Sequence, residues 1–322
     1  MAVSVVDAIG PALNRTGRIL FKPFDIGKWF TLGFCAWLAY LGQGGGGAGG
    51  GHGGSGGRGG GGAPSFDSVF EWANEHMAMI IAIGILVVLI GVAIGLLILW
   101  LNSRGQFMFL DGVARNRGAV VDPWRRFREL ANSLFWFRFV LGLIGLAGLI
   151  VIGGLGVAIA WPDIAARDFG GMAVAGIATG VLLFIVFAIV MGVISVLLRD
   201  FVVPVMYLRG VRSLPAWRIF RYEVARGYFW NFVLFYLMAI LLGLAIAIMA
   251  VVATCLTCCI AALPYIGTVI LLPIYVFMRC YSLCFLRQFG PDWDVFPADP
   301  VPAAPWPPPP TVPGRPAMPP QQ

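Results

Sequence analysis

Charged residues are scarce in this chain, since Asp, Glu, Lys and Arg make up only 11% of its 322 residues, against about 25% in soluble domains. Hydrophobic residues make up 59%, and the mean hydropathy is +0.87. A chain with so few polar groups has too little polar surface to face water on all sides, which excludes a soluble enzyme, and it is too apolar to be disordered. The composition therefore predicts an integral membrane protein.

Side chains that carry proton or metal chemistry are also few. The chain has two histidines, and no Asp or Glu lies at the centre of a long apolar run. A proton-coupled pump carries buried carboxylates within its membrane spans, so their absence counts against that class. An enzyme needs a nucleophile, a base and an orienting group placed together, and no such set is evident. We expect no catalytic residue, no cofactor and no metal site.

Polar loops contain no cysteine. All six cysteines lie in apolar stretches, which argues against a framework of disulfides. Cys255, Cys258 and Cys259 have the CxxC spacing of zinc and redox sites. No second pair of ligands is expected at the same depth in the membrane, so we interpret these cysteines as packing residues.

Six apolar segments predict an all-α polytopic membrane protein with six transmembrane helices. A span needs about 20 apolar residues to cross the hydrocarbon core. The six segments lie at about residues 27–41, 77–101, 134–160, 171–198, 229–262 and 266–286.

Positive charge is distributed unevenly between these segments. Twenty of the 22 Lys and Arg residues lie on one side of the predicted membrane, and only Arg58 and Arg167 lie on the other. Positive residues favour the cytoplasmic side. Both termini are therefore expected in the cytoplasm, and the basic balance reflects orientation in a bilayer, without a role in binding nucleic acid.

Two of the cytoplasmic segments repeat one another. Residues 124–136 align with residues 217–230 when one residue is inserted in the second copy. In each copy Trp and Phe fall on one helical face and Arg mostly off it, which is typical of a helix lying in the headgroup plane. We expect amphipathic elbow helices before the third and fifth spans, a third elbow near Val6 to Arg18, and internally repeated helix hairpins.

Two segments have biased composition. Residues 42–63 contain 16 glycines, which predicts a flexible linker on the outer side. Residues 291–322 contain 13 prolines, which predicts a disordered cytoplasmic tail or a peptide that docks in an aromatic groove of a protein partner. The expected domains are a membrane domain at residues 1–290 and a tail at residues 291–322.

Several arginines are candidates for contact with anionic lipid headgroups. Arg138 and Arg279 fall inside predicted spans near their cytoplasmic ends, where they either reach toward headgroups or line a cavity for an anionic headgroup or solute. Arginines of the elbows add to this basic surface. The full candidate set is Arg125, Arg126, Arg128, Arg138, Arg218, Arg221 and Arg279.

The segment from Asp7 to Leu38, followed by the glycine-rich loop, resembles a family of uncharacterised bacterial multi-pass membrane proteins. Residues 199–204, together with residues 217–220, look like the membrane domain attached to some glycerophosphodiester phosphodiesterases. The resemblance covers about residues 1–290 and implies a protein of the bacterial inner membrane with six spans. Hydrolase activity in that broader group belongs to a separate soluble domain, so the resemblance implies no catalytic residue here.

Two functions follow as hypotheses. The first is a non-enzymatic protein that organises the membrane or handles lipid, with anionic phospholipid headgroups as its partners. Under this first hypothesis, the protein also associates with itself or binds a protein partner through the Pro-rich tail. The second is a transporter or channel for a small solute, with a polar cavity lined by residues such as Ser195, Asn231 or Arg279.

Overall fold

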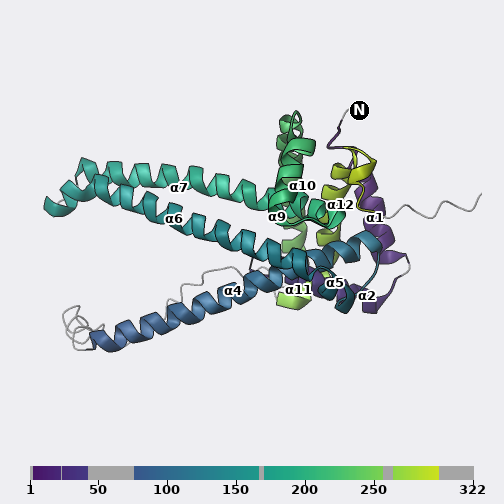
Figure 1. Cartoon of the computed structure of the whole chain (residues 1–322), viewed down its shortest axis with the longest axis horizontal. Helices are drawn as coiled ribbons and strands as arrows, with labels where there is room; N and C mark the ends of the chain where they lie inside the picture. Colours follow the sequence, from purple (N-terminus) through teal and green to yellow (C-terminus); the bar gives the residue numbers. More distant parts are fainter. Residues whose placement is uncertain (1–2, 23, 43–75, 167–169, 257–263, 297–322) are drawn as a thin grey trace, which may run out of the picture.

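The computed structural model describes residues 3–22, 24–42, 76–166, 170–256 and 264–296, and all regular structure within them is helical. Long helices project as arms from a body in which shorter helices are packed (Figure 1). The expected all-α class is confirmed for these residues. Most of the expected linker (43–63), most of the expected tail (297–322) and the Cys258–Cys259 pair lie outside them.

Three helices form the arms: α4 (Met77–Arg115), α6 (Arg128–Ala166) and α7 (Gly171–Leu197). A helix of 39 residues, the length of α4 and of α6, is about 58 Å long, which exceeds the roughly 30 Å of a hydrocarbon core. Within the most apolar stretch of α4 no residue is buried against the protein. The outer parts of the arms therefore expose apolar surfaces that the protein itself does not cover, and such surfaces are stable only in an apolar environment.

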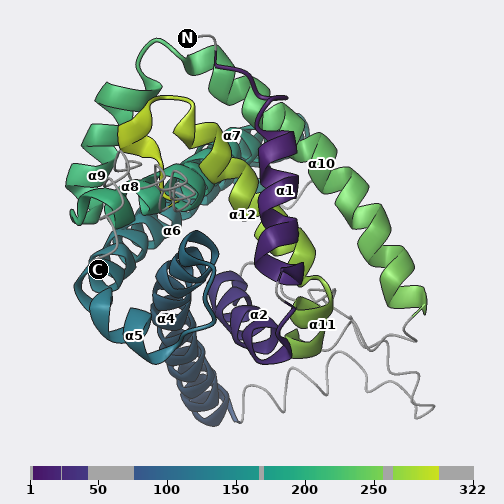
Figure 2. The same cartoon turned by 90° about the vertical axis from the view of Figure 1, so that its right-hand side faces the viewer.

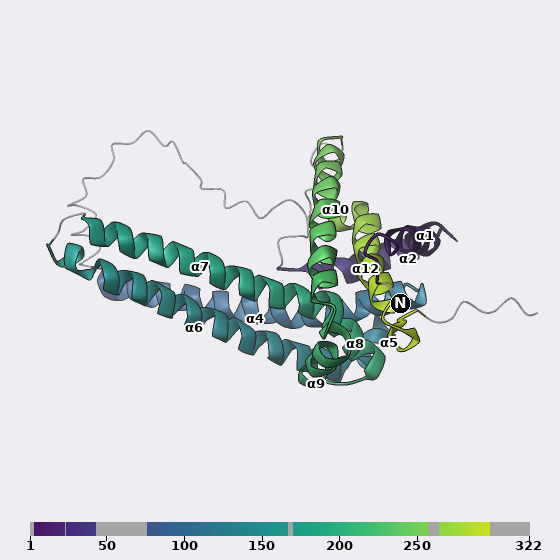
Figure 3. The ribbon, with the colours of Figure 1, turned by 90° about the horizontal axis from the view of Figure 1, so that it is seen from above.

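Four helices are long and apolar enough to cross a membrane. They are Met77–Arg115, Arg128–Asp163, Gly171–Arg209 and Phe229–Met249. The first three belong to the arms. The fourth lies in α10 (Phe229–Leu256), which runs across the direction of α6 and α7 (Figures 1 and 3).

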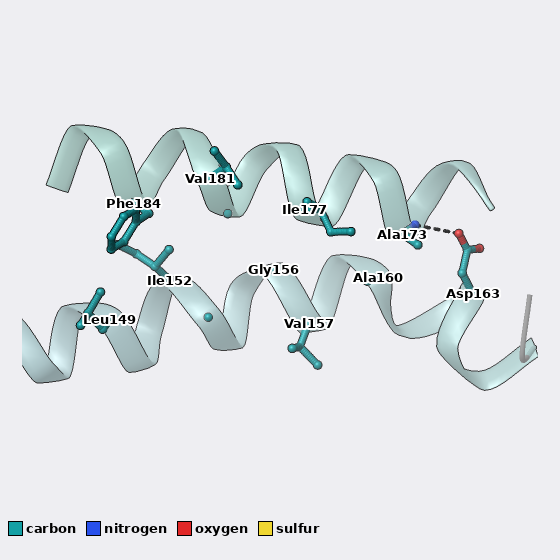
Figure 4. Close-up of a pocket in the computed structure, with 13 residues that line it drawn as sticks. Leu149, Ile152, Gly156, Val157, Ala160, Asp163, Ala173, Ile177, Val181 and Phe184 are labelled. Atoms are coloured by element: carbon teal, nitrogen blue, oxygen red, sulfur yellow. Dashed lines mark hydrogen bonds between the residues drawn. The ribbon is translucent and has the colours of Figure 1, made fainter. Parts of the chain in front are cut away.

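Small residues let α6 and α7 pack closely along their length. A Cβ added at Gly176 would lie 2.6 Å from the Gly156 carbonyl oxygen, so the two backbones nearly touch there. One Asp163 carboxylate oxygen (Oδ2) accepts a hydrogen bond of 2.7 Å from the Ala173 amide at the start of α7. The two helices thus form a hairpin that is closed at its outer end (Figure 4).

The body contains α1 (Ile9–Phe21), α2 (Ile26–Tyr40), α12 (Leu272–Arg287) and the last third of α4. Helix α1 lies against α12, and α2 lies against α4 (Figure 2). Residues 102–114 of α4 are all buried, in contrast to the exposed outer part of the same helix. One helix therefore serves as an arm over its first part and as core over its last.

The expected first and sixth spans correspond to shorter helices. Helix α2 has 15 residues, about 22 Å at the usual rise. The segment expected as the sixth span is divided into α11 (Pro264–Ile270) and α12, with a break at Leu271 before Pro273. Ten of the 16 residues of α12 are buried in the body. By length and composition, neither segment is among the four candidate spans in the described residues.

The expected elbows are short helices, but their aromatic faces pack on the body. They are α5 (Val121–Arg126) before α6, and α9 (Ser213–Ile219) with the π-helix η2 (Phe220–Ala225) before α10. Phe127 and Phe220 are buried, and Trp124 and Trp217 are partly buried against the same core.

Helix α1, in the region where a third elbow is expected, packs one face on the body. Its buried residues are Ala12, Thr16, Ile19 and Leu20, whereas Leu13 is 62% exposed. The buried face of α1 combines two small residues, Ala12 and Thr16, with the bulkier Ile19 and Leu20, whereas Leu13 is directed outward.

Residues 291–296, which composition assigns to the tail, pack on the body. Trp293, in the 3-10 helix η4 (Pro291–Trp293), and Phe296 are buried. The Arg15 guanidinium lies 3.7 Å from the centre of the Phe296 ring. Near the other end of the chain, the Ser4 amide donates to the Gln288 side-chain oxygen at 2.7 Å, and the Gln288 side-chain nitrogen donates to the Ser4 carbonyl at 2.8 Å. The described parts of both chain ends therefore meet on one side of the body.

Candidate functional site

The seven candidate arginines fall into two groups. Five of them are exposed on the elbows and at the start of α6: Arg125, Arg126, Arg128, Arg218 and Arg221. Arg138 is partly buried on α6, and Arg279 is only 4% exposed on α12. The structure therefore separates a basic surface from a pair of interior arginines.

The basic surface is held in place by the aromatic side of each elbow. The Phe127 ring packs on the rings of Phe107 and Tyr207, with centroids 5.9 and 5.1 Å away. In the second elbow the Phe220 ring stacks on Phe201 at 5.6 Å. Because these rings are fixed in the core, the arginines beside them point to solvent or to a membrane surface.

The interior pair belongs to a larger arginine cluster, made of Arg138, Arg199 and Arg279. Arg279 Nη1 donates to the Arg199 carbonyl oxygen at 2.8 Å. The charge on Arg138 experiences repulsion from both Arg199 and Arg279. Three helical elements, α6, the π-helix η1 (Leu198–Val202) and α12, thus bring three positive charges together.

Among the residues that the structure describes, Asp200 supplies a negative charge to the cluster. Arg199 Nε lies 3.0 Å from an Asp200 carboxylate oxygen, and its guanidinium lies 5.6 Å from the centre of the Tyr40 ring. Arg138 Nη1 donates to the Asn102 side-chain oxygen. The three arginines and Asp200 together carry a formal charge of 3 − 1 = +2.

Local geometry at η1 places Arg199 and Asp200 where they meet. The helix widens from α7 into the π-helix and continues as α8 (Val203–Arg209). Phe201 of η1 anchors the turn, since its ring contacts Phe235 at 5.2 Å and Phe285 at 6.0 Å. π-helical turns inside longer helices are frequent at functional sites.

Some polar atoms around the cluster are buried without a hydrogen-bond partner. They are Nε and Nη2 of Arg279 and the hydroxyl of Tyr236. Asp200 and Arg199 act electrostatically on Tyr236, which places its hydroxyl close to the cluster. A buried donor that lacks an acceptor costs about 1–3 kcal/mol, and more when it is charged.

Arg138 lines a cavity of about 490 Å³. Its polar lining residues are Asn102, Arg138 and Ser195, and the rest of the lining is apolar. The apolar lining comes from the end of α2 and from α4, α6 and the α7–η1 helix: Leu41, Gly42, Gly95, Ile98, Leu99, Leu141, Gly142, Met191 and Leu198. The cavity is thus lined by apolar side chains together with one cation, Arg138, and two neutral polar residues.

A second hollow of about 780 Å³ lies between α6 and α7, further from the body. Figure 4 shows apolar side chains on both helices, among them Ile152 and Phe184, with small residues between them. Asp163 is at its outer end, and its Oδ2 atom already accepts the Ala173 amide. This hollow presents no charged group without a partner.

A second polar network, centred on Asp111, is structural. The Asp111 side chain is fully buried. It accepts hydrogen bonds from Arg117 Nη2 at 2.9 Å and from the Tyr207 hydroxyl at 2.9 Å, and it lies 3.2 Å from Arg115 Nε. Its charge is therefore matched by two arginines, and it joins the end of α4 to α8.

Of the two residues Ser195 and Asn231, which the sequence suggested as lining a polar cavity, only one lies at the cavity. Ser195 lines the cavity, but Asn231 does not, since its side-chain nitrogen donates to the Val3 carbonyl at 2.9 Å. Within the described ranges, no group of three or more His, Cys, Asp or Glu side chains is arranged to hold a metal. Cys35, Cys280 and Cys284 are buried free thiols.

Sequence reasoning did not identify Asn102, Arg199 and Asp200 as site residues. Asn102, Arg199 and Asp200 lie just after the end of a long apolar run, and Arg138 lies near the start of another such run. Polar residues at the same end of several apolar runs are brought to one level when the helices pack side by side. The position of these polar residues at the same end of the apolar runs is the sequence feature that could have predicted the site.

Comparison with protein families matches residues 3–272 to a family described as one of unknown function, DUF7544. No curated protein and no solved structure matches the chain. The resemblance to the membrane domain of glycerophosphodiester phosphodiesterases therefore has no support from these comparisons. The family match extends over well over half of the sequence and includes both elbows and the arms. The chain belongs to the family of unknown function DUF7544.

Proposed function

We propose that this protein is a non-enzymatic membrane protein that gathers anionic phospholipid headgroups at its elbows. The observation that carries the proposal is the group of five exposed arginines beside buried aromatic anchors: Arg125, Arg126, Arg128, Arg218 and Arg221. Each basic residue near an anionic leaflet contributes about 1 kcal/mol of attraction. The elbows hold these charges at the start of α6 and of α10, two of the four candidate spans.

The proposal includes a topology and a location. We propose six membrane segments, in which α2 and the α11–α12 pair complete three repeated units of elbow and helix hairpin. The uneven distribution of Lys and Arg supports both termini in the cytoplasm. We propose the bacterial inner membrane as the location and distant similarity to the phosphodiesterase membrane domain as the origin of the fold. Self-association or a protein partner at the Pro-rich tail belongs to the same proposal.

Lipid analysis of the protein extracted with its surrounding membrane tests the headgroup function. We expect anionic lipid to be enriched around the protein relative to the bulk membrane. Replacing the five elbow arginines by Gln should lower that enrichment several-fold, and raising the salt concentration should lower it in the wild type. The screening length falls from about 10 Å at 0.1 M salt to about 3 Å at 1 M.

A variant with Lys at the same five positions is the matched control, because it keeps the charge and should keep the enrichment. Equal lipid composition around the wild type and the Gln variant would show that the elbows do not select headgroups.

A transporter or channel is the second candidate, and one observation favours it. Ser195 lies with Asn102 and Arg138 in the cavity between the arms. Anion flux into liposomes that contain the protein tests this function. Flux that is absent from protein-free liposomes and lost in Arg138→Gln would favour transport over a static lipid-binding role.

A further inference from the structure

Two donors of Arg279 lack an acceptor among the residues that the structure describes. Arg279 is 4% exposed, and its Nε and Nη2 have no hydrogen-bond partner. Its Nη1 is bound to a backbone carbonyl, which carries no net charge. Burial of a guanidinium without an anion is costly, since the effective penalty is several kcal/mol per ion. An anion with several acceptor oxygens would lower that cost.

The charge balance of the cluster favours an anionic ligand. Within the described part of the chain, the cluster of Arg138, Arg199 and Arg279 faces the carboxylate of Asp200, which is bound to Arg199 and also attracts the charge of Arg279. Arg138 itself is held by the neutral Asn102 amide. Two positive charges of the set thus have only neutral hydrogen-bond partners among the contacts described here. Phosphate oxygens accept from guanidinium groups in paired geometry, which makes phosphate a well-matched anion.

The apolar walls of the cavity indicate that the ligand has a hydrocarbon part in addition to its anionic group. Beside Arg138, the cavity is lined by apolar side chains of four helical segments, including Ile98, Leu141 and Met191. Its volume of about 490 Å³ is within the range of about 300–1,000 Å³ that is common for ligand pockets. A small hydrated anion would leave these walls in contact with water, whereas a hydrocarbon chain would cover them.

We propose that the cavity binds one phosphate-bearing lipid, with its phosphate at Arg138, which lines the cavity, and its acyl chain between α4, α6 and α7. Arg279 lies outside the lining and adds positive charge near Arg138. This inference deepens the headgroup function proposed above, but it rests on interior residues and not on the elbows. The shared chemistry is a phosphate ester, and its two sources are a membrane lipid and a water-soluble phosphate. The apolar walls favour the lipid.

Native mass spectrometry of the purified full-length protein tests the site. The probes are phosphatidylglycerol, phosphatidylcholine with the same acyl chains, and glycerol phosphate. We expect one phosphatidylglycerol to bind at a concentration about tenfold lower than phosphatidylcholine, a difference of about 1.4 kcal/mol. Glycerol phosphate should bind weakly or not at all, because it has no chain.

Arginine variants test the role of positive charge. Arg138→Gln and Arg279→Gln should each remove the preference for phosphatidylglycerol. Arg226→Gln removes the same charge from an exposed position outside the cavity and should leave the preference unchanged. Thermal unfolding of each variant shows whether a loss of binding reflects a loss of folding.

A cavity-filling variant keeps the proposal testable if the arginine variants fail to fold. A Cβ added at Gly142 meets no atom within 4 Å, and Gly142 lines the cavity. Gly142→Leu should therefore block the acyl chain with all arginines in place. Gly154→Leu is the matched control, because Gly154 lies on the same helix in open space away from the cavity.

The outcomes separate this site from the elbows. Loss of the bound lipid in Gly142→Leu, with unchanged lipid enrichment at the elbows, supports the interior site alone. Glycerol phosphate that binds equally well to the wild type and to Gly142→Leu would overturn the lipid in favour of a soluble phosphate. Equal binding of both phospholipids to the wild type and to every variant would overturn the site.

Discussion

Asp111 shows at the scale of one residue how charge organises this apolar chain. Its buried carboxylate contacts Arg115, Arg117 and the Tyr207 hydroxyl. Both arginines are about one-third exposed, so water and salt screen part of the attraction. The carboxylate itself has no access to water and depends on these partners.

Asp111→Asn should lower the free energy of unfolding by about 1–3 kcal/mol, because two partly buried arginines lose their anion. Thermal unfolding of the protein in lipid nanodiscs measures the effect. Asp122→Asn is the control, since Asp122 is 76% exposed and lies 3.8 Å from Arg117. A similar small change in both variants would mean that Asp111 is not a stabilising anchor.

The sequence identified Arg138 and Arg279 as unusual because each interrupts an apolar run. Arg199 was not identified because it follows the end of such a run, where a charged residue is ordinary. Its inclusion in the cluster depends on the π-helical turn and on the packing of α12 against η1. Neither feature is encoded in the spacing of residues along one segment.

At the scale of elements, α2 and α4 approach each other closely in the body. A Cβ added at Gly105 would lie 2.6 Å from the Ala39 nitrogen and 2.6 Å from the Leu38 carbonyl carbon. Both of these are backbone atoms and cannot move without shifting α2. Any side chain at this position must separate the two helices.

Gly105→Ala should therefore lower the free energy of unfolding by about 1–3 kcal/mol, the usual cost of overpacking. Gly91→Ala on the same helix, where an added Cβ meets nothing, should be neutral or stabilising by up to about 1 kcal/mol. Chemical denaturation of the two variants in detergent provides the comparison. Equal stability of both would contradict the close contact of α2 and α4.

A second element-scale prediction concerns the start of α7. Asp163 caps this helix from α6 through the bond to the Ala173 amide. Asp163→Ala should cost about 1 kcal/mol locally and increase hydrogen exchange over residues 171–176. Exchange in the inner half of α7 should be unchanged and serves as the internal control. Uniform exchange in both proteins would show that the cap is not required.

Helix positions were predicted well where apolar runs were long, as in α4, α6, α7 and α10. The prediction was coarser for residues 27–41 and 266–286, because an apolar run has the same composition whether lipid or protein covers it. Helix α2 is short, and α12 is largely buried. The sequence correctly predicted that each elbow has an apolar aromatic face. It did not predict that the body of the protein covers this face.

At the scale of the whole molecule, tryptophans delimit a membrane-sized section of α6. Trp136 and Trp161 are 58% and 63% exposed, and they are about 38 Å apart along the helix. This spacing is between the roughly 30 Å of the hydrocarbon core and the 40–45 Å of the full bilayer. Exposed tryptophans favour the headgroup level at both interfaces.

Spin labels on α6 test this placement in nanodiscs, in a variant with its native cysteines replaced. A label at Leu149→Cys, midway between the two tryptophans, should be the most accessible to oxygen and the least accessible to a water-soluble nickel chelate. A label at Arg128→Cys should show the reverse. Equal access of the chelate to both positions would exclude α6 as a span.

Truncation tests how the chain ends contribute to the body. Removing residues 297–322 should leave the melting temperature unchanged. Removing residues 291–322 should lower it, because Trp293 and Phe296 leave the core, and each buried aromatic contributes about 1.5–3 kcal/mol. Equal melting temperatures of the two truncated proteins would show that this segment does not stabilise the body.

The contact between the N-terminal and C-terminal parts of the core also determines when the core can form during synthesis. Val5 and Ala8 are made almost 290 residues before Trp293 and Phe296, yet all four belong to one core. The apolar arms, which need few contacts with the body, can enter the membrane while the ribosome is still translating. The core cannot close until residues 293–296 have emerged. A ribosome stalled before that point should therefore carry a chain that is inserted and still sensitive to protease on the side of the body.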